Sequence, residues 1–377
     1  CLGAFGGAFP CGSFPVPPCF FIRRPVRPPF FLPIPLGFSK KFPAAPCGTG
    51  AVPPRYPTGI GVFSFLIYDL TIYSFRISYR LLFFYFFLII PFYYSHLDWD
   101  RDDYYPLGRT GRGTGRTTHG EWKTYYQFMN DQITELLTNY GPIGAIWFDG
   151  WWDHDQDPGF DWQLPEQYAM IHRLQPACLI GNNHHQVPFA GEDIQIFERD
   201  LPGENNAGLS GQDISRLPLE TCETMNGMWG YKIVDQNYKS VKTLIHYLVK
   251  AAGRNANLLM NIGPQPNGEL PAAALERLKA IGEWTKQYGE TIYGTRGGDI
   301  SPRDWGVTTR KGDKLYVHIL NLPDKGLFLP LTTGKVKSAV VFKDRKPVKF
   351  SQDKNGVVLE LAEVPAELDY VIELTIK

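Results

Sequence analysis

The pattern of hydrophobic and polar positions changes abruptly near residue 92. Up to Pro91 the chain is crowded with Pro, Phe and Gly, and its only acidic residue is Asp69. Repeated prolines oppose regular helix, and the high aromatic content does not fit a solvated, disordered linker. Residues 1–91 therefore match neither a folded domain nor a linker. We hypothesise that they are a shifted reading frame joined to a genuine coding segment near Phe92.

The N-terminal region contains no recognisable membrane or export signal. The apolar run at residues 81–90 is ten residues long, whereas a helix that crosses a bilayer needs roughly 20. A signal peptide needs a charged start, a short apolar core and a small-residue cleavage site, and this arrangement is missing. The sequence therefore predicts no membrane span.

After residue 92 the pattern alternates between short apolar runs and longer amphipathic stretches. Residues 92–99 begin apolar and then turn polar, which is typical of a buried parallel strand that ends at a site. Residues 122–140 have helical spacing and stop at Gly141-Pro142. The apolar positions of that helix are Tyr126, Met129, Ile133, Leu136 and Leu137. A short buried strand follows at residues 143–148.

The alternation continues and then changes to strands alone. We expect helices at 164–174, 240–252 and 271–289, the last with Leu275, Leu278, Ile281 and Trp284 on one face, and strands at 178–181, 192–197 and 257–264. Beyond residue 299 only strand patterns occur. The prediction is an α/β fold: a (β/α) TIM-like barrel, incomplete at its N-terminal strands, over residues 92–298, and a C-terminal β-sandwich over 299–377.

Composition narrows the class of protein. Lys+Arg and Asp+Glu both number 38, so no broad positive field exists to hold a nucleic acid. Four of the six cysteines lie before residue 48, and Cys178 and Cys222 fall in segments predicted as strand and loop. These positions predict buried thiols and no disulfide framework. The glycine-rich residues 108–116 lack the Gly-Lys-Ser/Thr of a phosphate loop, so we interpret them as a surface loop.

Candidate chemistry centres on carboxylates at strand ends. Asp149 follows the apolar strand at 143–148 and is surrounded by Trp147, Trp151 and Trp152, which suit the faces of a sugar. We predict that Asp149 is a nucleophile; the alternative is a cap of the following turn. Glycoside hydrolysis needs a second carboxyl group. Four glutamates are candidates for it: Glu198, at a strand end and therefore preferred, Glu220 in second place, Glu204 and Glu223.

Several spaced motifs carry a family resemblance. They include Trp-Phe-Asp-Gly at 147–150, Phe-Glu-Arg-Asp-Leu-Pro-Gly at 197–203, the segment ending in Trp-Gly-Tyr at 220–231, and Asn-Leu-Leu-Met-Asn-Ile-Gly-Pro at 257–264. In order and spacing the chain from residue 92 resembles the α-L-fucosidases of glycoside hydrolase family 29. The resemblance implies a retaining double displacement on terminal α-L-fucose, and an extracytoplasmic, periplasmic or secreted, location.

The resemblance also implies residue roles. Asp149 matches the nucleophile, and the acid/base falls on Glu198 or on Glu220, depending on which motif is aligned; we predict Glu198, with Glu220 as runner-up. The implied substrate-binding residues are Tyr93, Trp147, His184 and Trp229. No metal or cofactor is implied, and a metal at His184 and His185 would lack a third ligand at useful spacing. The expected partner is a fucosylated oligosaccharide or glycoconjugate.

One departure from the family pattern leaves two functional interpretations open. The family's early strands supply histidines and a tryptophan that grip fucose, yet no His precedes His96 in this chain. The first interpretation is an active, retaining α-L-fucosidase. The second is an inactive or truncated fucose-binding fragment of the same fold, and a hydrolase of another sugar is a weaker third. Oligomeric state and linkage preference are not encoded in any local pattern.

Overall fold

A computed structural model describes residues 90–377 apart from residues 118 and 364. All described residues belong to one compact unit. The predictions for residues 1–91, including the shifted reading frame, lie outside the described residues except for the last two positions.

Six parallel strands follow one another in chain order. They are β1 (Ile90–Ser95), β2 (Ile143–Asp149), β3 (Leu179–Asn182), β4 (Gln195–Glu198), β5 (Leu219–Thr224) and β6 (Ala256–Asn261). Strands β1, β2 and β3 form one sheet and β4, β5 and β6 another. A parallel bridge between Gly181 and Ile194 links the two sheets. Within the described residues these strands do not close into a barrel.

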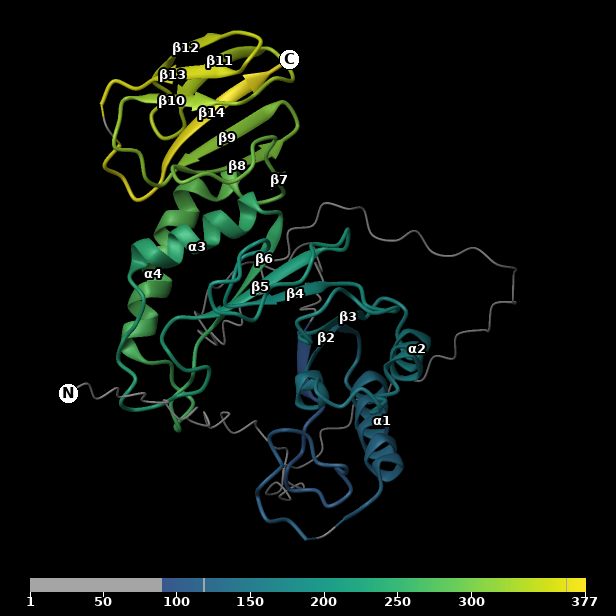
Figure 1. The fold of residues 1–377 in the computed structure, drawn as a ribbon. Coiled ribbons are helices and arrows are strands. Elements are labelled where there is room, and N and C mark those ends of the chain that lie inside the picture. The colour runs from purple at the N-terminus through teal and green to yellow at the C-terminus, as the bar shows by residue number, and fades with distance from the viewer. Residues whose placement is uncertain (1–89, 118, 364) are drawn as a thin grey trace, which may run out of the picture. The chain divides into compact units, whose positions relative to one another are not determined.

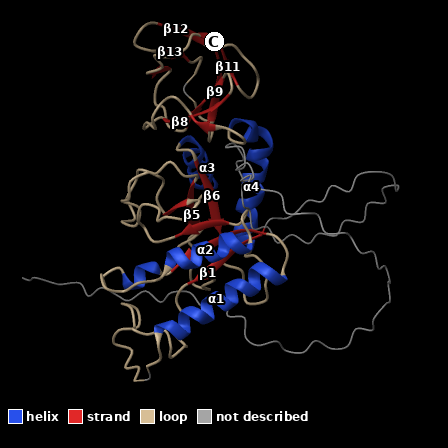
Figure 2. Cartoon of the chain, turned by 90° about the vertical axis from the view of Figure 1, so that its right-hand side faces the viewer, coloured by secondary structure: helices blue, strands red, loops and turns tan. Residues whose placement is uncertain are grey.

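Helices follow β1, β2, β5 and β6, whereas β3, β4 and β5 follow one another without a helix between them. The helices are α1 (Trp122–Asn139), η1 (Trp151–His154), α2 (Leu164–Leu174), α3 (Val241–Gly253), α4 (Ala272–Tyr288) and η2 (Gly289–Thr291). Helices α1 and α2 contact each other and α3 contacts β6 (Figure 2). Among the residues that the structure covers, no helix is long and apolar enough to cross a membrane.

Two helix faces differ from the predicted ones by one position each. On α1 the buried stripe begins at Tyr125 instead of Tyr126, because residue 125 lies one turn before Met129. On α4 the buried position is Ala274, while Leu275 is half exposed. In both helices the sequence offers two adjacent apolar residues, and packing selects the one aligned with the rest of the stripe.

Strand β2 ends at the predicted nucleophile, Asp149, whose side chain lies on the face away from α1 and α2. Ile146 and Phe148 are buried against α1 and α2. Because successive side chains of a strand point to opposite faces, Trp147 and Asp149 lie on the face away from these helices. Cys222, predicted in a loop, instead lies within β5, where residues 221–224 are all buried; the two-residue alternation that marks a half-exposed strand is therefore missing.

The C-terminal part consists of strands, as predicted. They are β7 (Arg296–Gly297), β8 (Gly306–Lys311), β9 (Lys314–Ile319), β10 (Gly326–Leu329), β11 (Val336–Val341), β12 (Lys349–Gln352), β13 (Val357–Glu360) and β14 (Tyr370–Ile376). One sheet has the order β11-β14-β9-β8-β7 and the other β10-β13-β12 (Figure 1). Apolar side chains of both sheets share one core.

Candidate active site

Asp149 is the last residue of β2, and donors on both sides fix its carboxylate. The hydroxyl of Tyr93 donates to Oδ2 at 2.6 Å. The indole N–H of Trp152 and the backbone N–H of Gly150 donate to Oδ1 at 3.0 and 2.8 Å. Three donors on one carboxylate orient it and stabilise its ionised form.

The Asp-Gly pair explains how the chain turns at this point. Gly150 has a φ of 108°, in the left-handed region that favours glycine. A Cβ at this position would lie 2.7 Å from Cγ of Leu97. Glycine therefore allows the turn that brings the backbone N–H of residue 150 back to the carboxylate of Asp149.

Glu198 is the last residue of β4 and also has two side-chain partners. The amide of Asn183 donates to Oε2 at 2.7 Å, and Nε2 of His185 lies 3.1 Å from the same oxygen. The hydroxyl of Ser210 accepts from the backbone N–H of Glu198 and donates to its carbonyl. The backbone and the carboxylate of Glu198 are thus both held in place.

Asn183 connects the two predicted catalytic carboxylates. Its amide nitrogen lies 3.5 Å from Oδ1 of Asp149 and 2.7 Å from Oε2 of Glu198. The structure therefore brings Asp149 and Glu198, at the ends of β2 and β4 on either side of β3, within reach of one amide group.

Glu220 lies on the same face of the β4-β5-β6 sheet as Glu198, but two residues earlier along the strands. The indole N–H of Trp147 donates to its Oε1 at 2.8 Å. In the parallel register, Glu220 pairs with Ile196, whereas Cys222 pairs with Glu198. Two residues of strand correspond to about 6.6 Å, so Glu220 lies deeper along the strands than Glu198.

The three carboxyl groups differ in their proton affinity. Burial raises the pKa of Asp149, and the charge of Glu198 adds to this, although the bond from Tyr93 acts in the opposite direction. Burial also raises the pKa of Glu220, to about 7. For Glu198, burial acts upward as well, but the bonds from His185 and Asn183 outweigh it, so its pKa lies below the ordinary value.

The predicted substrate-binding aromatic residues of β1 and β2 form a pair. The rings of Tyr93 and Trp147 stack with centroids 5.4 Å apart, and Tyr93 is 56% exposed. Trp229 lies beside the guanidinium of Arg199, which is 5.0 Å from its ring. Arg199 directly follows Glu198 in the chain, so the contact with Arg199 places Trp229 near the carboxylates.

The structure places His184 away from the carboxylates. It is buried, its Nδ1 accepts from the backbone N–H of Gln186, and its Nε2 donates to Glu192 at 3.0 Å. Both ring nitrogens are therefore engaged within the protein. Asn183 and His185, whose contact with the acid/base candidate the sequence did not predict, bind Glu198 instead. Residue 183 directly follows β3 and His185 has a left-handed φ of 62°, so these contacts depend on a loop conformation that no local periodicity predicts.

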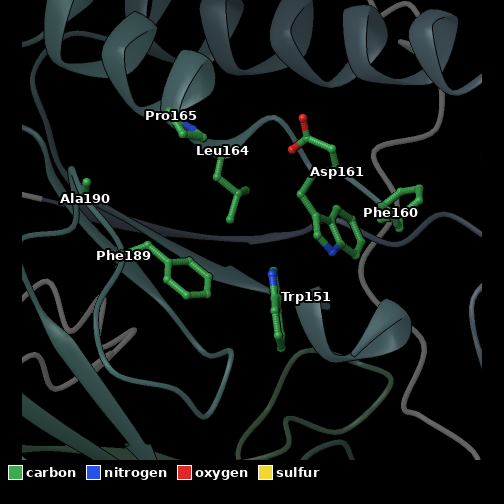
Figure 3. Close-up of a pocket in the computed structure, with 8 residues that line it drawn as sticks. Trp151, Phe160, Asp161, Leu164, Pro165, Phe189 and Ala190 are labelled. Atoms are coloured by element: carbon green, nitrogen blue, oxygen red, sulfur yellow. The ribbon is translucent and has the colours of Figure 1, made fainter. Parts of the chain in front are cut away.

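An aromatic pocket of about 210 Å³ lies beside His184. Trp151 and Phe189 form part of its wall, and both rings contact the imidazole of His184. Figure 3 shows the indole nitrogen of Trp151 directed toward the space between Leu164 and Phe189. His184 thus supports this pocket and not the carboxylate pair.

The thiols and possible metal ligands contribute little to the site. Cys178 and Cys222 are both free and buried, as predicted. Burial raises the pKa of each thiol, which keeps both protonated and unreactive. Among the described residues, no group of three or more His, Cys, Asp or Glu side chains is arranged to hold a metal ion.

These features together define a class of site. Two carboxylates at the carboxyl ends of neighbouring but not adjacent parallel strands, here β2 and β4 with β3 between them, beside aromatic rings, are an arrangement found in glycoside hydrolases of the α/β type. The family model described as α-L-fucosidase matches residues 88–290. This chain belongs to the α-L-fucosidase family.

Individual relatives agree with this membership. Alpha-L-fucosidase isoenzyme 1 from Paenibacillus thiaminolyticus is 32% identical, with a TM-score of 0.63 over 76% of this chain and 71% of its own. An α-L-fucosidase of Dictyostelium discoideum is 25% identical over 74% of this chain, and a plasma α-L-fucosidase of Rattus norvegicus is 30% identical over 65%. The chain spans 60% and 55% of the lengths of these last two proteins.

Proposed function

We propose that the chain hydrolyses terminal α-L-fucose by a retaining double displacement, with Asp149 as the nucleophile and Glu198 as the acid/base. The observation that carries the proposal is the contact of one amide, that of Asn183, with both carboxylates.

The spacing of the two carboxylates supports retention over inversion. Oδ1 of Asp149 and Oε2 of Glu198 can be no further apart than the sum of their contacts with Nδ2 of Asn183, which are 3.5 and 2.7 Å. That sum is below the separation of about 6.5 Å at which inverting enzymes begin to accommodate a water molecule. A direct attack by Asp149 on the sugar fits this spacing better.

Each carboxylate then has a defined task. Asp149 attacks the anomeric carbon while the bond to the leaving oxygen breaks, and Glu198 gives that oxygen a proton. Glu198 then takes a proton from water, which attacks the anomeric carbon and releases Asp149. The donors around Asp149 favour the ionised form that the first step requires. Glu198 is favoured over Glu220 as the acid/base because it shares the amide of Asn183 with Asp149 and lies at a strand end.

The proposal extends to architecture and context. The six parallel strands in chain order fit part of a (β/α) barrel, and the two C-terminal sheets with a common core fit a β-sandwich. We propose a division between these parts near residue 298. The substrate would be a fucosylated oligosaccharide or glycoconjugate, and the location periplasmic or extracellular.

Turnover of an aryl α-L-fucoside tests the proposal, with an α-D-galactoside and a β-D-glucoside as controls. We expect hydrolysis of the fucoside alone, with the α-anomer of fucose as the first product seen by NMR. Asp149→Ala should lower turnover by about three orders of magnitude or more, because the covalent step is lost. A folded protein without fucoside turnover would instead support the alternative of a fucose-binding fragment.

A further inference from the structure

The glycine-rich segment 108–116, which the sequence predicted as a surface loop, is fastened to the residues that follow the nucleophile. The backbone N–H of Arg109 donates to the carbonyl of Asp153 at 2.8 Å. The backbone N–H and the hydroxyl of Thr110 donate to Oδ1 of Asp153 at 2.8 and 2.6 Å. A Cβ on Gly108 would lie 2.0 Å from Oδ2 of the same residue. Asp153 is buried, so its carboxylate holds the start of this segment tightly on η1.

This attachment places the side chain of Arg109 over the ring of Trp152. The guanidinium lies 5.0 Å from the centroid of the indole ring, within the distance of about 6 Å over which a cation and an aromatic face attract each other. Asp155 holds the same guanidinium, because Nη1 of Arg109 donates to its Oδ2 at 3.1 Å. One backbone contact and one ion pair therefore keep the cation above the indole.

Trp152 connects this cation to the proposed chemistry. Its indole N–H donates to Oδ1 of Asp149 at 3.0 Å. Burial raises the pKa of Asp149, and the bond from Trp152 acts against this rise. A positive charge over the ring draws electron density from the indole nitrogen, which makes its N–H a stronger donor. The stack also restricts rotation of the indole, whose N–H bonds well only while it points at the carboxylate.

We propose that Arg109 is a positioning residue for the nucleophile, which acts through the ring of Trp152 to keep the indole N–H on the carboxylate of Asp149. This inference rests on the proposed function, because it assumes that Asp149 attacks the sugar. The same bond would stabilise the carboxylate that is released when the covalent intermediate is hydrolysed, so both steps of the reaction depend on it.

Arg112, three residues further along the same segment, offers a matched control. Its guanidinium pairs with Asp157, two residues beyond the partner of Arg109. Arg112→Gln therefore removes the same charge from the same segment and leaves the stack of Arg109 on Trp152 in place. A difference between the two variants reports the stack and not the loss of one positive charge.

Turnover of a nitrophenyl α-L-fucoside as a function of pH gives the first test. Arg109→Gln should lower kcat/KM by about two- to fivefold, the range for a partly exposed cation over an indole. It should also move the acidic limb to higher pH, because Asp149 loses part of a bond that favours its ionised form. Arg109→Lys keeps a cation and should recover part of both changes, and Arg112→Gln should keep the wild-type values. Tyr93 and Glu198, which also act on the pKa of Asp149, are the same in every variant.

A double-variant cycle with Trp152→Phe shows whether Arg109 acts through the indole. Phenylalanine keeps a ring below the guanidinium but has no N–H for Asp149. In this background Arg109→Gln should change neither kcat/KM nor the acidic limb any further. A loss as large in the Trp152→Phe background as in the wild type would overturn the inference, because Arg109 would then act by another route.

An NMR titration without substrate keeps this inference separate from the proposed function. The chain has nine Trp residues, and with ¹⁵N-labelled tryptophan the indole signal that is lost in Trp152→Phe belongs to Trp152. This signal should follow the ionisation of Asp149, with a midpoint at higher pH in Arg109→Gln than in the wild type or Arg112→Gln.

The two proposals then fail in different ways. If the wild type turns over no fucoside but the midpoint moves in Arg109→Gln, the proposed function fails and Arg109 remains the residue that positions Trp152. If fucoside is turned over and the midpoint is the same in all three proteins, the inference is overturned and the proposed function stands.

Discussion

At the scale of single residues, the site depends on which hydrogen-bond donors contact each carboxylate. Tyr93 and Trp152 both bond Asp149, while Asn183 is divided between Asp149 and Glu198. Each donor stabilises negative charge where the proposed mechanism needs it. The consequences can be tested one residue at a time.

Tyr93→Phe should move the acidic limb of the pH profile. The hydroxyl of Tyr93 lowers the pKa of Asp149, so its loss raises that pKa and the acidic limb of kcat/KM shifts to higher pH. A hydrogen bond to a charged group contributes about 1.5 to 3 kcal/mol, which corresponds to a loss in kcat/KM of about tenfold to a hundredfold. The measurement is kcat/KM for the aryl fucoside as a function of pH.

Tyr94→Phe is the control for this change. Its hydroxyl donates to Gln132 on α1, on the opposite face of β1. This variant should keep the wild-type pH profile. An acidic limb that stays fixed or moves to lower pH in Tyr93→Phe would show that Tyr93 does not act on the ionised nucleophile.

Glu198→Gln and Glu220→Gln separate the two candidates for the acid/base. Loss of the true acid/base should lower kcat/KM for a fucosyl disaccharide by about 10² to 10⁴. We expect this fall for Glu198→Gln. With an aryl fucoside, whose leaving group needs no acid, azide should raise kcat of this variant and form α-fucosyl azide, because azide attacks the covalent intermediate in place of water without needing a base. For Glu220→Gln we expect a loss below about tenfold and no azide product.

The pKa values of the two glutamates, taken alone, favour Glu220 as the proton donor. Burial raises the pKa of Glu220 to about 7, which suits a proton donor, whereas the pKa of Glu198 is lowered by its two partners. Azide rescue in the Glu220 variant, and none in the Glu198 variant, would exchange the two assignments. Our assignment therefore rests on the placement of Glu198 at the strand ends.

At the scale of elements, strand register and helix capping decide how the site is presented. Register places Glu198 beside Cys222, two residues beyond Glu220 on the neighbouring strand. Helix α3 supports the same sheet through its contact with β6. Its first turn begins at Ser240, whose hydroxyl accepts from the backbone N–H of Thr243 at 3.1 Å.

Ser240→Ala should destabilise α3 without touching the site. Loss of an N-cap acceptor costs about 1 kcal/mol, which lowers Tm by roughly 2 to 4 °C in a unit of this size. Ser240→Asp, which keeps an acceptor at the N-cap, should remain close to the wild type. Thermal unfolding followed by circular dichroism measures both. A wild-type Tm for the alanine variant would show that the cap does not stabilise the helix.

At the scale of the whole described molecule, the α/β part and the C-terminal strands share a core. Val307 and Tyr316 of the C-terminal strands belong to the same buried cluster as Leu244 of α3 and Trp284 of α4. The imidazole of His246 on α3 also contacts the carbonyl of Leu368 at 2.6 Å. We therefore expect both parts to unfold in one transition.

Tyr316→Ala tests this cooperativity. Tyr316 is fully buried, and removing its ring should cost about 3 to 5 kcal/mol. One transition should move to lower temperature, with the same midpoint by circular dichroism and by tryptophan fluorescence. Tyr316→Phe keeps the ring and loses only the bond to Glu290, so it should cost about 1 kcal/mol. Two separate transitions, only one of them shifted, would contradict the shared core.

The sequence by itself determined the order and type of most elements after residue 92, but not β5, which it predicted as a loop. It also placed Asp149 and Glu198 at strand ends. These features follow from local periodicity, because an apolar run followed by a polar residue marks the end of a buried strand wherever that strand lies in the fold. The predicted helix at 164–174 has the same bounds as α2.

Only the tertiary structure decided which side chains meet. It placed Asn183 and His185 beside Glu198 and turned His184 toward Glu192. It also put Glu220 two residues deeper along the strands than Glu198. Local patterns cannot specify such contacts, since the direction of a side chain in a loop and the register between strands depend on packing between segments that are distant in the sequence.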